Sequence, residues 1–166
     1  MSRRRVVITG LGIVSPVGNS ISESWDNILA GKSGIAPITS FDVSAFSTRF
    51  AGMVKDFDIT QYIPAKDARK MGEFIHYGIA ASCQAFDDAG LEVTEENAER
   101  IGIAIGSGIG GLPGIEVAHN AYLDGGPRKI SPFFVPGNII NMIAGNLSIT
   151  HGIKLSLIHI SEPTRQ

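Results

Sequence analysis

The part of the sequence that most constrains this chain is residues 100–146, RIGIAIGSGIGGLPGIEVAHNAYLDGGPRKISPFFVPGNIINMIAGN. It begins with the β-branched run 101–105, which predicts a buried strand, and then breaks into the glycine-dense turn 106–111. The basic pair Arg128 and Lys129 follows, and after it an apolar, proline-marked segment. A glycine turn, two cations and an apolar lining in succession predict the mouth of a site for a ligand with an anionic head and an apolar tail.

The turn GSGIGG fits the pattern G-x-G-x-x-G, which after a strand is a dinucleotide-binding fingerprint. That fingerprint normally opens the first βαβ unit, with an acidic residue ending a second strand ~20 residues later, and this acidic residue is missing here. Pro113 is also poorly placed for close helix–strand packing. An NAD(P)-binding oxidoreductase therefore stays an alternative, which a binding titration tests.

Composition narrows the class of protein. With 166 residues, 43% of them hydrophobic and 18% charged, the chain is long enough for one globular domain with a core. A net charge of −2 gives no electrostatic reason to expect binding to nucleic acid or to an anionic membrane. The single cysteine fits a reducing compartment, and no run approaches the ~18 apolar residues of a membrane span. We expect a soluble, cytoplasmic protein.

Hydrophobic periodicity indicates an α/β fold. Residues 5–11 form a short β-branched run before glycine, the pattern of a strand buried on both faces. Ser20 and Glu23 form a capping box for a helix that Gly31 ends. Further elements are expected as follows: a short strand at 50–54, a helix from Pro64 to Gly90, a capped turn after Thr94, a helix at 114–122, a turn at 124–127, a turn at 131–132, and a helix at 138–151 that Gly152 ends.

The titratable residues give no catalytic or metal site by themselves. Cys83 lies on the apolar face of the helix that ends at Gly90, so we expect a packed, unreactive thiol. The four histidines show no metal-ligand spacing with one another or with Cys83. Lys66, Arg69 and Lys70 are spaced to share one helix face, although a merely solvated face is the alternative because Asp67 and Glu73 are close in sequence.

Several motifs together carry a family resemblance: RRVVITGLGIVSPVG, WDNILAGKSGI, KDARKM, IGIAIGSGIGGL and GGPRKISPFFVP. In order and spacing they resemble the amino-terminal part of the β-ketoacyl-acyl carrier protein synthase II family, the elongating condensing enzymes of bacterial type II fatty acid synthesis. The resemblance covers residues 1–154. It implies a thiolase-like α/β fold with αβαβα layers, of which this chain holds an incomplete first half.

The resemblance also implies a reaction, a decarboxylating Claisen condensation. An acyl group moves from acyl carrier protein to a cysteine, and malonyl-acyl carrier protein then loses CO₂ and attacks the thioester. This chemistry needs a thiolate, an oxyanion hole and two histidines, and no cofactor. In the family these catalytic side chains come after the matched region, so the chain should contain no catalytic residue and be inactive alone.

Three substrate-binding positions follow from the resemblance. Ile109 matches a position that lines the acyl pocket and gates it, Gly108 lets the acyl chain approach, and Phe134 matches a wall of the neighbouring subunit's tunnel in a homodimer. A positive surface expected to dock the acidic carrier protein is matched by Lys66, Arg69, Lys70, Arg128 and Lys129.

After Lys154 the sequence departs from the family. Residues 155–166 read LSLIHISEPTRQ, which lacks cysteine and resembles translated sequencing-adapter read-through, with a divergent natural tail as the alternative. Resequencing the source DNA across this junction decides between the two. A catalytically empty partner subunit is a further alternative for the chain. Because a half-domain leaves sheet edges and core faces uncovered, we predict poor solubility in isolation.

Overall fold

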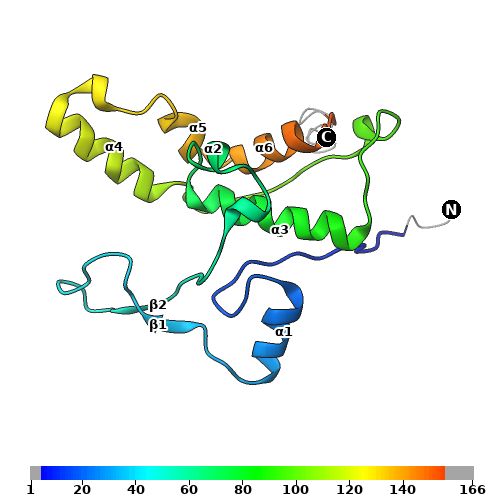
Figure 1. The fold of residues 1–166 in the computed structure, drawn as a ribbon, viewed down its shortest axis with the longest axis horizontal. Helices are drawn as coiled ribbons and strands as arrows, with labels where there is room; N and C mark the ends of the chain where they lie inside the picture. The colour runs from blue at the N-terminus through cyan, green and yellow to red at the C-terminus, as the bar shows by residue number, and fades with distance from the viewer. Residues whose placement is uncertain (1–4, 156–166) are drawn as a thin grey trace, which may run out of the picture. The chain divides into compact units, whose positions relative to one another are not determined.

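A computed structural model describes residues 5–155, so the predicted non-native tail lies outside the described residues except for Leu155. The described chain forms two compact units (Figure 1). The first comprises residues 5–58 and 80–90, and the second comprises residues 59–79 and 91–155. The long helix α3, Glu73–Ala89, contributes its first part to the second unit and its last part to the first.

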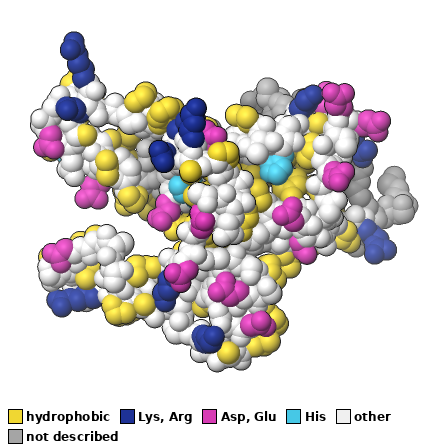
Figure 2. Space-filling model, viewed as in Figure 1, with side chains coloured by type: hydrophobic (Ala, Val, Ile, Leu, Met, Phe, Trp, Pro, Cys, Tyr) yellow, Lys and Arg dark blue, Asp and Glu magenta, His cyan; other side chains and the backbone are white. Residues whose placement is uncertain are grey.

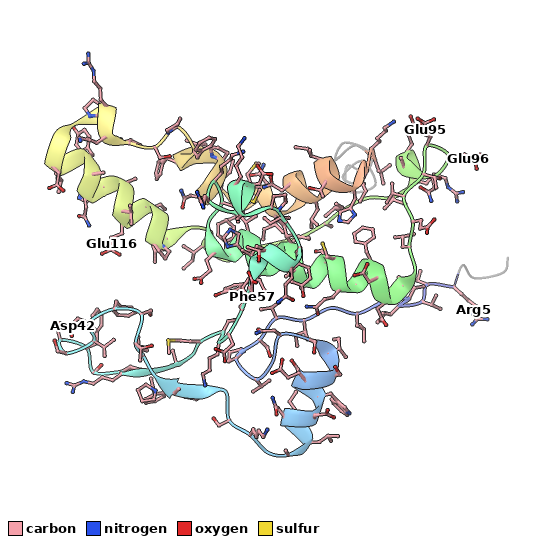
Figure 3. The ribbon with its side chains drawn as sticks, viewed as in Figure 1. Arg5, Asp42, Phe57, Glu95, Glu96 and Glu116 are labelled. Atoms are coloured by element: carbon pink, nitrogen blue, oxygen red, sulfur yellow. The ribbon has the colours of Figure 1, made fainter. Side chains whose placement is uncertain are left out.

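The first unit contains the helix α1, Ile21–Leu29, and a hairpin of two strands. The Ser20 side chain accepts a hydrogen bond from the Glu23 backbone, which confirms the predicted N-cap, and Gly31 follows the helix with φ +66°. Strands β1, Ile35–Pro37, and β2, Phe50–Gly52, pair antiparallel. The loop between them carries Asp42 (Figure 3). Both carboxylate oxygens of Asp42 accept hydrogen bonds from Ser44, and these bonds lower the pKa of the Asp42 carboxyl.

The strand predicted at residues 5–11 does not form a ladder, and the prediction that it is buried was wrong. Val6 is 90% exposed and Ile8 is 83% exposed. Instead, α3 side chains accept hydrogen bonds from the backbone N–H groups of residues 11 and 13. The Leu11 N–H donates to Asp88 Oδ2 at 2.8 Å, and the Ile13 N–H donates to Gln84 Oε1 at 3.1 Å. A strand needs neighbouring strands to hydrogen-bond with, and the described residues offer none here.

The second predicted buried strand, residues 101–105, is likewise an unpaired segment in the described structure. Ile101, Ile103 and Ile105 are half-buried, whereas Gly102 and Ala104 are exposed. The two-residue alternation of a strand is therefore present, but only one side of the segment is covered. The β-branched composition correctly marked an extended apolar run and wrongly implied partners on both sides.

Helices dominate the second unit, besides the first part of α3. Its elements in chain order are η1 (Ile59–Gln61), α2 (Ala65–Ala68), η2 (Ala98–Arg100), α4 (Leu112–Gly125), η3 (Pro127–Lys129), α5 (Phe134–Asn138) and α6 (Met142–His151). The helix expected at 114–122 is confirmed as the longer α4, and Gly126 follows it with φ +75°. The turn expected at Ser131 forms, with the Phe133 N–H donating to Ser131 Oγ at 3.1 Å. Near Thr94 the predicted turn leads into η2, where the Ala98 N–H donates to the Thr94 carbonyl at 2.9 Å.

The single helix predicted from Pro64 to Gly90 is two helices, because the chain breaks between α2 and α3. At the break the Gly72 N–H donates to the Gly137 carbonyl of α5 at 2.8 Å. This tertiary hydrogen bond replaces the helical one that a continuous helix would make. The predicted end is correct, since Gly90 has φ +57° and follows the last residue of α3.

The last predicted helix is shorter than expected at its start. Asn138 belongs to α5, Ile139 is extended, and α6 begins at Met142, whereas Gly152 ends α6 in the left-handed conformation as predicted. Ile143 and Leu147 of α6 are buried, and Gly78 of α3 packs directly on Ile143. The other buried apolar side chains of this unit are Ile63, Ala68, Ile75, Ile79, Ala98 and Ile153.

Many large apolar side chains remain exposed, as the yellow areas in Figure 2 show. On α1, Trp25 is 59% exposed and Leu29 is 68% exposed. None of the helices within residues 5–155 is long and apolar enough to cross a membrane. Of the layered α/β fold that we expected, the described residues supply the helices and a two-stranded sheet.

Candidate functional site

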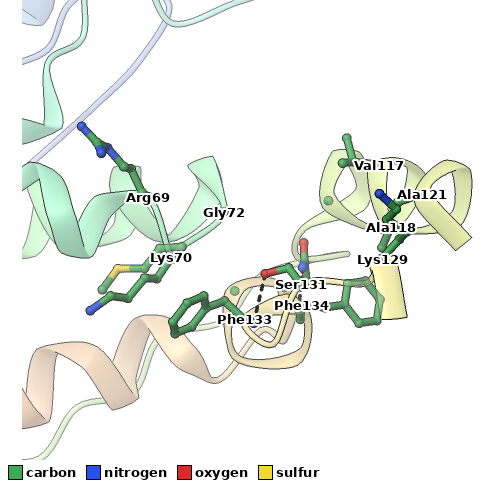
Figure 4. A pocket seen from close by; sticks show the side chains of 14 residues that line it. Arg69, Lys70, Gly72, Val117, Ala118, Ala121, Lys129, Ser131, Phe133 and Phe134 are labelled. Carbon is green, nitrogen blue, oxygen red and sulfur yellow. Dashed lines mark hydrogen bonds between the residues drawn. The ribbon is translucent and has the colours of Figure 1, made fainter. Parts of the chain in front are cut away.

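A cavity of about 240 Å³ lies in the second unit, between the α2–α3 break, α4 and α5 (Figure 4). Its polar rim includes Arg69, Lys70 and Lys129, and its apolar wall includes Phe134, Phe133 and Val117. Four of the eight residues predicted for binding therefore line one cavity, although they come from three separate stretches of sequence. This arrangement of cations beside an aromatic wall fits the ligand type that the sequence predicted.

The cations of the site differ in their surroundings. Lys70 Nζ lies 2.6 Å from Asp67 Oδ1 and 5.9 Å from the centre of the Phe133 ring. The hydrogen bond from Lys70, together with its charge, lowers the pKa of the Asp67 carboxyl. Lys70 is thus already paired, whereas Arg69 and Lys129 are exposed and have no carboxylate within ion-pair distance among residues 5–155.

The two remaining predicted cations lie outside the cavity lining. Lys66 is exposed on α2 and Arg128 is exposed on η3. Figure 2 shows dark blue Lys and Arg side chains over this part of the second unit. The prediction that Lys66, Arg69 and Lys70 share one helix face was wrong in detail, because α2 ends at Ala68. Glu116 lies on α4 (Figure 3) and is not among the residues that line the cavity.

Gly108 and Ile109 do not line this cavity. Ile109 is 70% exposed, and a side chain added at Gly108 would meet no atom within 4 Å. The turn that carries them is nevertheless fastened to α5, because the Gly111 N–H donates to the Asn138 carbonyl at 3.0 Å. Asn138 itself was not predicted from the sequence. The only signal for it was the pair of glycines three residues apart, Gly111 and Gly114, which leave room for a neighbouring side chain.

The end of the glycine turn, residues 110–113, does not present free N–H groups in the way that a dinucleotide fingerprint does. The Gly110 N–H donates to Ser107 Oγ at 3.2 Å, and the Leu112 N–H donates to the Gly110 carbonyl at 3.1 Å. The Gly111 N–H is used by Asn138, and Pro113 has no N–H. The N–H groups of residues 110–112 are therefore occupied by the protein itself, which disfavours pyrophosphate binding at the start of this helix.

Cys83 lies in the middle of α3 and is half-buried. Burial, and to a smaller extent the charge of Asp87, raises the pKa of its thiol, so the reactive thiolate is disfavoured as we predicted. His76 Nε2 pairs with the Ala68 carbonyl at 2.9 Å. Among residues 5–155 no three His, Cys, Asp or Glu side chains gather closely enough to hold a metal ion.

Residues 3–159 match the family described as Beta-ketoacyl synthase, N-terminal domain. The chain belongs to the β-ketoacyl synthase family. Its relatives include the 3-oxoacyl-[acyl-carrier-protein] synthase 2 proteins of Vibrio harveyi and Vibrio cholerae, each 63% identical over 161 residues. These matches cover 97% of this chain and 39% of each relative. The corresponding Coxiella burnetii protein is 54% identical over 154 residues, covering 93% of this chain and 37% of that relative.

Solved β-ketoacyl synthase structures share the fold of this chain. A β-ketoacyl synthase from Burkholderia phymatum is 28% identical with a TM-score of 0.76, over 93% of this chain and 38% of that one. A type II PKS ketosynthase bound to the hexaketide, in complex with its acyl-carrier protein, matches with the same identity and a TM-score of 0.76 over 92% and 41% of the two chains. The ishigamide ketosynthase/chain length factor is 30% identical with a TM-score of 0.73, over 89% and 37%.

These likenesses confirm the predicted family and the thiolase-like fold class, with this chain corresponding to a first part of it. The chain spans about 39% of the length of the Vibrio relatives. None of the proteins named above is an NAD(P)-dependent oxidoreductase, and the occupied N–H groups of the glycine turn also weigh against that alternative.

Proposed function

We propose that residues 1–154 form the amino-terminal part of an elongating β-ketoacyl-[acyl-carrier-protein] synthase of fatty acid biosynthesis, and that residues 155–166 are a non-native tail. The observation that carries the proposal is the 63% identity with proteins named 3-oxoacyl-[acyl-carrier-protein] synthase 2 over almost the whole chain. The enzyme would be a transferase that acts in the cytoplasm as a homodimer and needs no cofactor.

The reaction joins an acyl thioester to malonyl-acyl carrier protein. The acyl group is first transferred to an enzyme cysteine as a thioester. The malonyl group then loses CO₂, and the resulting carbanion forms a C–C bond with the acyl carbonyl carbon while the bond to the cysteine sulfur breaks. The half-buried Cys83, with its raised pKa, is unsuited to hold the acyl group. This chain alone is therefore inactive and supplies binding surfaces.

Two of these surfaces are represented in the second unit. Lys66, Arg69, Lys70, Arg128 and Lys129 form the surface that would dock the acidic carrier protein. The solved structure of a similar ketosynthase in complex with its acyl-carrier protein supports this kind of partner. Gly108, Ile109 and Phe134 would line the passage of the acyl chain, with Phe134 reaching the neighbouring subunit's tunnel. Because Lys70 is paired with Asp67, we expect Lys66 and Arg69 to contribute more to docking than Lys70 does.

The test uses a hybrid synthase, in which residues 1–154 of this chain replace the matching segment of the Vibrio harveyi relative. Lys66→Glu with Arg69→Glu should weaken binding of acyl carrier protein ~10-fold at low salt, because opposite charge across an interface raises the association rate. Reactivity of the active-site thiol towards a small alkylating reagent should not change. Lys32→Glu with Lys55→Glu, which alters the same number of charges in the first unit, is the matched control. Unchanged affinity at low salt would refute the docking surface.

A second candidate function, a catalytically empty partner subunit, has one observation in its favour. The chain is 30% identical to the ishigamide ketosynthase/chain length factor, with a TM-score of 0.73. The two candidates differ in acylation. Incubation of the complete natural protein with acyl-acyl carrier protein should give a covalent acyl-enzyme if it is a synthase and none if it is an empty partner. Acylation at Cys83 would overturn both the prediction that the nucleophile comes after the matched region and the prediction of an unreactive thiol.

A further inference from the structure

Asn138, the last residue of α5, makes one hydrogen bond to another segment of the second unit and one within its own helix. Its carbonyl accepts from the Gly111 N–H at 3.0 Å, and its side-chain Nδ2 donates to the Phe134 carbonyl at 2.5 Å. The first bond reaches the turn that carries Ile109, and the second reaches the residue predicted as tunnel wall. A single residue therefore contacts both segments predicted to line acyl passages, the one that carries Ile109 for its own subunit and the one that carries Phe134 for the neighbouring subunit.

The remaining polar atom of the Asn138 side chain is positioned by packing and not by a hydrogen bond. Its Oδ1 is buried and has no hydrogen-bond partner within the described structure. It lies against Gly111 and Gly114, where an added Cβ would overlap it. A 180° rotation of the amide would place this oxygen against the Phe134 carbonyl oxygen, so the observed orientation is the one that hydrogen bonding allows. A buried acceptor without a donor destabilises a fold, and its presence calls for a compensating role.

At the end of the turn only glycine leaves enough room for Asn138. Gly110 has φ +84°, and a Cβ there would lie 2.5 Å from the Asn138 carbonyl oxygen. The α5 end is also held from its other side, since the Gly137 carbonyl accepts from the Gly72 N–H at 2.8 Å. Loss of the Asn138 side chain should keep the hydrogen bond from the Gly111 N–H, because the backbone carbonyl accepts it, and should leave α5 anchored. It removes the amide that packs against Gly111 and Gly114, so the turn gains room to shift.

We propose that Asn138 is a positioning residue that fixes the turn carrying Ile109 relative to Phe134, and that it thereby sets which acyl chains the synthase accepts. The inference rests on the proposed function. Asn138 does not react with the substrate, because it acts through the position of the turn. Fixing the gate matters most for long acyl chains, which in the homodimer must pass Ile109 of one subunit and the partner subunit's Phe134, and least for short ones.

The experiment compares the hybrid synthase with its Asn138→Ala variant on hexanoyl- and tetradecanoyl-acyl carrier protein. We expect the ratio of kcat/KM between the two substrates to change ~10-fold, a size typical of altered apolar pocket contacts. Asn146→Ala is the matched control. Asn146 Nδ2 also donates to the carbonyl four residues earlier, Met142, at 2.7 Å, but no glycine is packed against it. This control should leave the ratio unchanged.

Rescue distinguishes positioning from general loss of stability. Gly114→Ala alone places a methyl group where Asn138 Oδ1 lies, so it should shift the selectivity ratio in the same direction as Asn138→Ala. The double variant Gly114→Ala, Asn138→Ala should recover part of the lost selectivity and of the lost Tm, because the new methyl group fills the space that the amide leaves.

The outcomes separate the two proposals. A hybrid synthase that condenses no acyl substrate, although it folds, would contradict the proposed function. An active hybrid in which Asn138→Ala and Gly114→Ala both keep the parental selectivity ratio would overturn the role of Asn138. If Asn138→Ala fails to fold, the Gly114→Ala variant, which retains the asparagine, decides the question alone.

Discussion

Two glycine turns in this chain follow similar apolar runs and have opposite surroundings. In the first unit Gly10 and Gly12 lie directly on the backbone of α3. A Cβ on Gly10 would lie 2.7 Å from the Ala89 nitrogen, and one on Gly12 would lie 2.9 Å from the Ala85 nitrogen. In the second unit a Cβ on Gly106 or Gly108 would meet no atom within 4 Å.

The difference shows two uses of the same residue. At residues 10–12 glycine allows a segment and a helix to approach closely, and the α3 side chains of Asp88 and Gln84 complete the contact. The turn at 106–111 is divided. Its last glycines are held by Asn138, whereas its first ones border open space, as expected of a surface that an acyl chain approaches. Glycine in the first turn should therefore matter for stability, and glycine at position 108 for function.

The largest expected effect comes from Gly12→Ala. The added methyl group would overlap the Ala81 carbonyl oxygen in the backbone of α3, which cannot move aside as a flexible side chain can. We expect a loss of about 3 kcal/mol in the free energy of unfolding of the hybrid synthase, measured by urea denaturation. Gly106→Ala makes the same chemical change where there is space, so it should be close to neutral. Equal losses from the two variants would remove the distinction between the turns.

Gly110→Ala should have the second-largest effect, because it tests the held end of the divided turn. Its positive φ strains a residue that has a Cβ, and that Cβ would also press on the Asn138 carbonyl oxygen. We expect a loss of about 2 kcal/mol in the free energy of unfolding. Gly31→Ala has a similar φ of +66° with no atom near the added group, so it isolates the strain and should cost about 1 kcal/mol. An equal cost at both positions would show that Asn138 does not restrict the turn.

A smaller effect is expected from Gln84→Ala, which removes the side chain that completes the first turn. Gln84 accepts from the Ile13 N–H and donates to the Asn19 carbonyl at 2.7 Å. Leaving these partly buried backbone groups without partners should cost about 1–2 kcal/mol in the free energy of unfolding. Asp88→Ala removes one exposed bond, to the Leu11 N–H, and should cost less because water can replace the carboxylate. A larger loss from Asp88→Ala than from Gln84→Ala would contradict this ranking.

The local elements of this fold could be predicted from the sequence, and their partners could not. The capping box at Ser20 and the glycines that end α1, α3 and α6 act within a few residues, so their effects were visible in the sequence. The break before Gly72 depends on the carbonyl of residue 137, far along the chain, and no residue near Gly72 predicts this hydrogen bond. Residues 5–11 and 101–105 have strand composition, but pairing requires neighbours that the described residues do not contain.

The same distinction applies to the candidate site. The family motifs predicted Arg69, Lys70, Lys129 and Phe134 as binding residues, and the structure places all four around one cavity, although their binding role stays a prediction. Asn138 was missed because its importance comes from fitting between glycines that belong to another segment. A side chain that acts by complementary shape has no motif of its own.

The smallest expected effect is on the alkylation rate of the Cys83 thiol. Cys83 lies two residues from both Ala81 and Ala85 on α3, so its alkylation rate shows whether the helix keeps its packing. Because burial raises its pKa, less of the thiol is ionised at pH 8 than in a free cysteine. Below the pKa, each unit of increase lowers the thiolate fraction about tenfold, so alkylation by iodoacetamide should be slow. The rate is measured by mass spectrometry of the peptide that carries Cys83, which separates it from the other cysteines of the hybrid synthase.

Two variants show which cause of the slow alkylation dominates. Asp87→Asn removes a nearby negative charge, so the pKa of the Cys83 thiol falls and alkylation should become about 2-fold faster. The gain should be smaller than that from unfolding the chain, because burial is the larger cause of the raised pKa. Gly12→Ala, by pushing on the α3 backbone, should also speed alkylation, whereas Gly106→Ala should leave the rate unchanged. If Gly12→Ala alkylates at the parental rate, α3 keeps its packing without the first turn. The close approach of Gly12 to α3 would then not be needed for the packing of α3. The two glycine turns would differ in where they lie and not in their importance for stability.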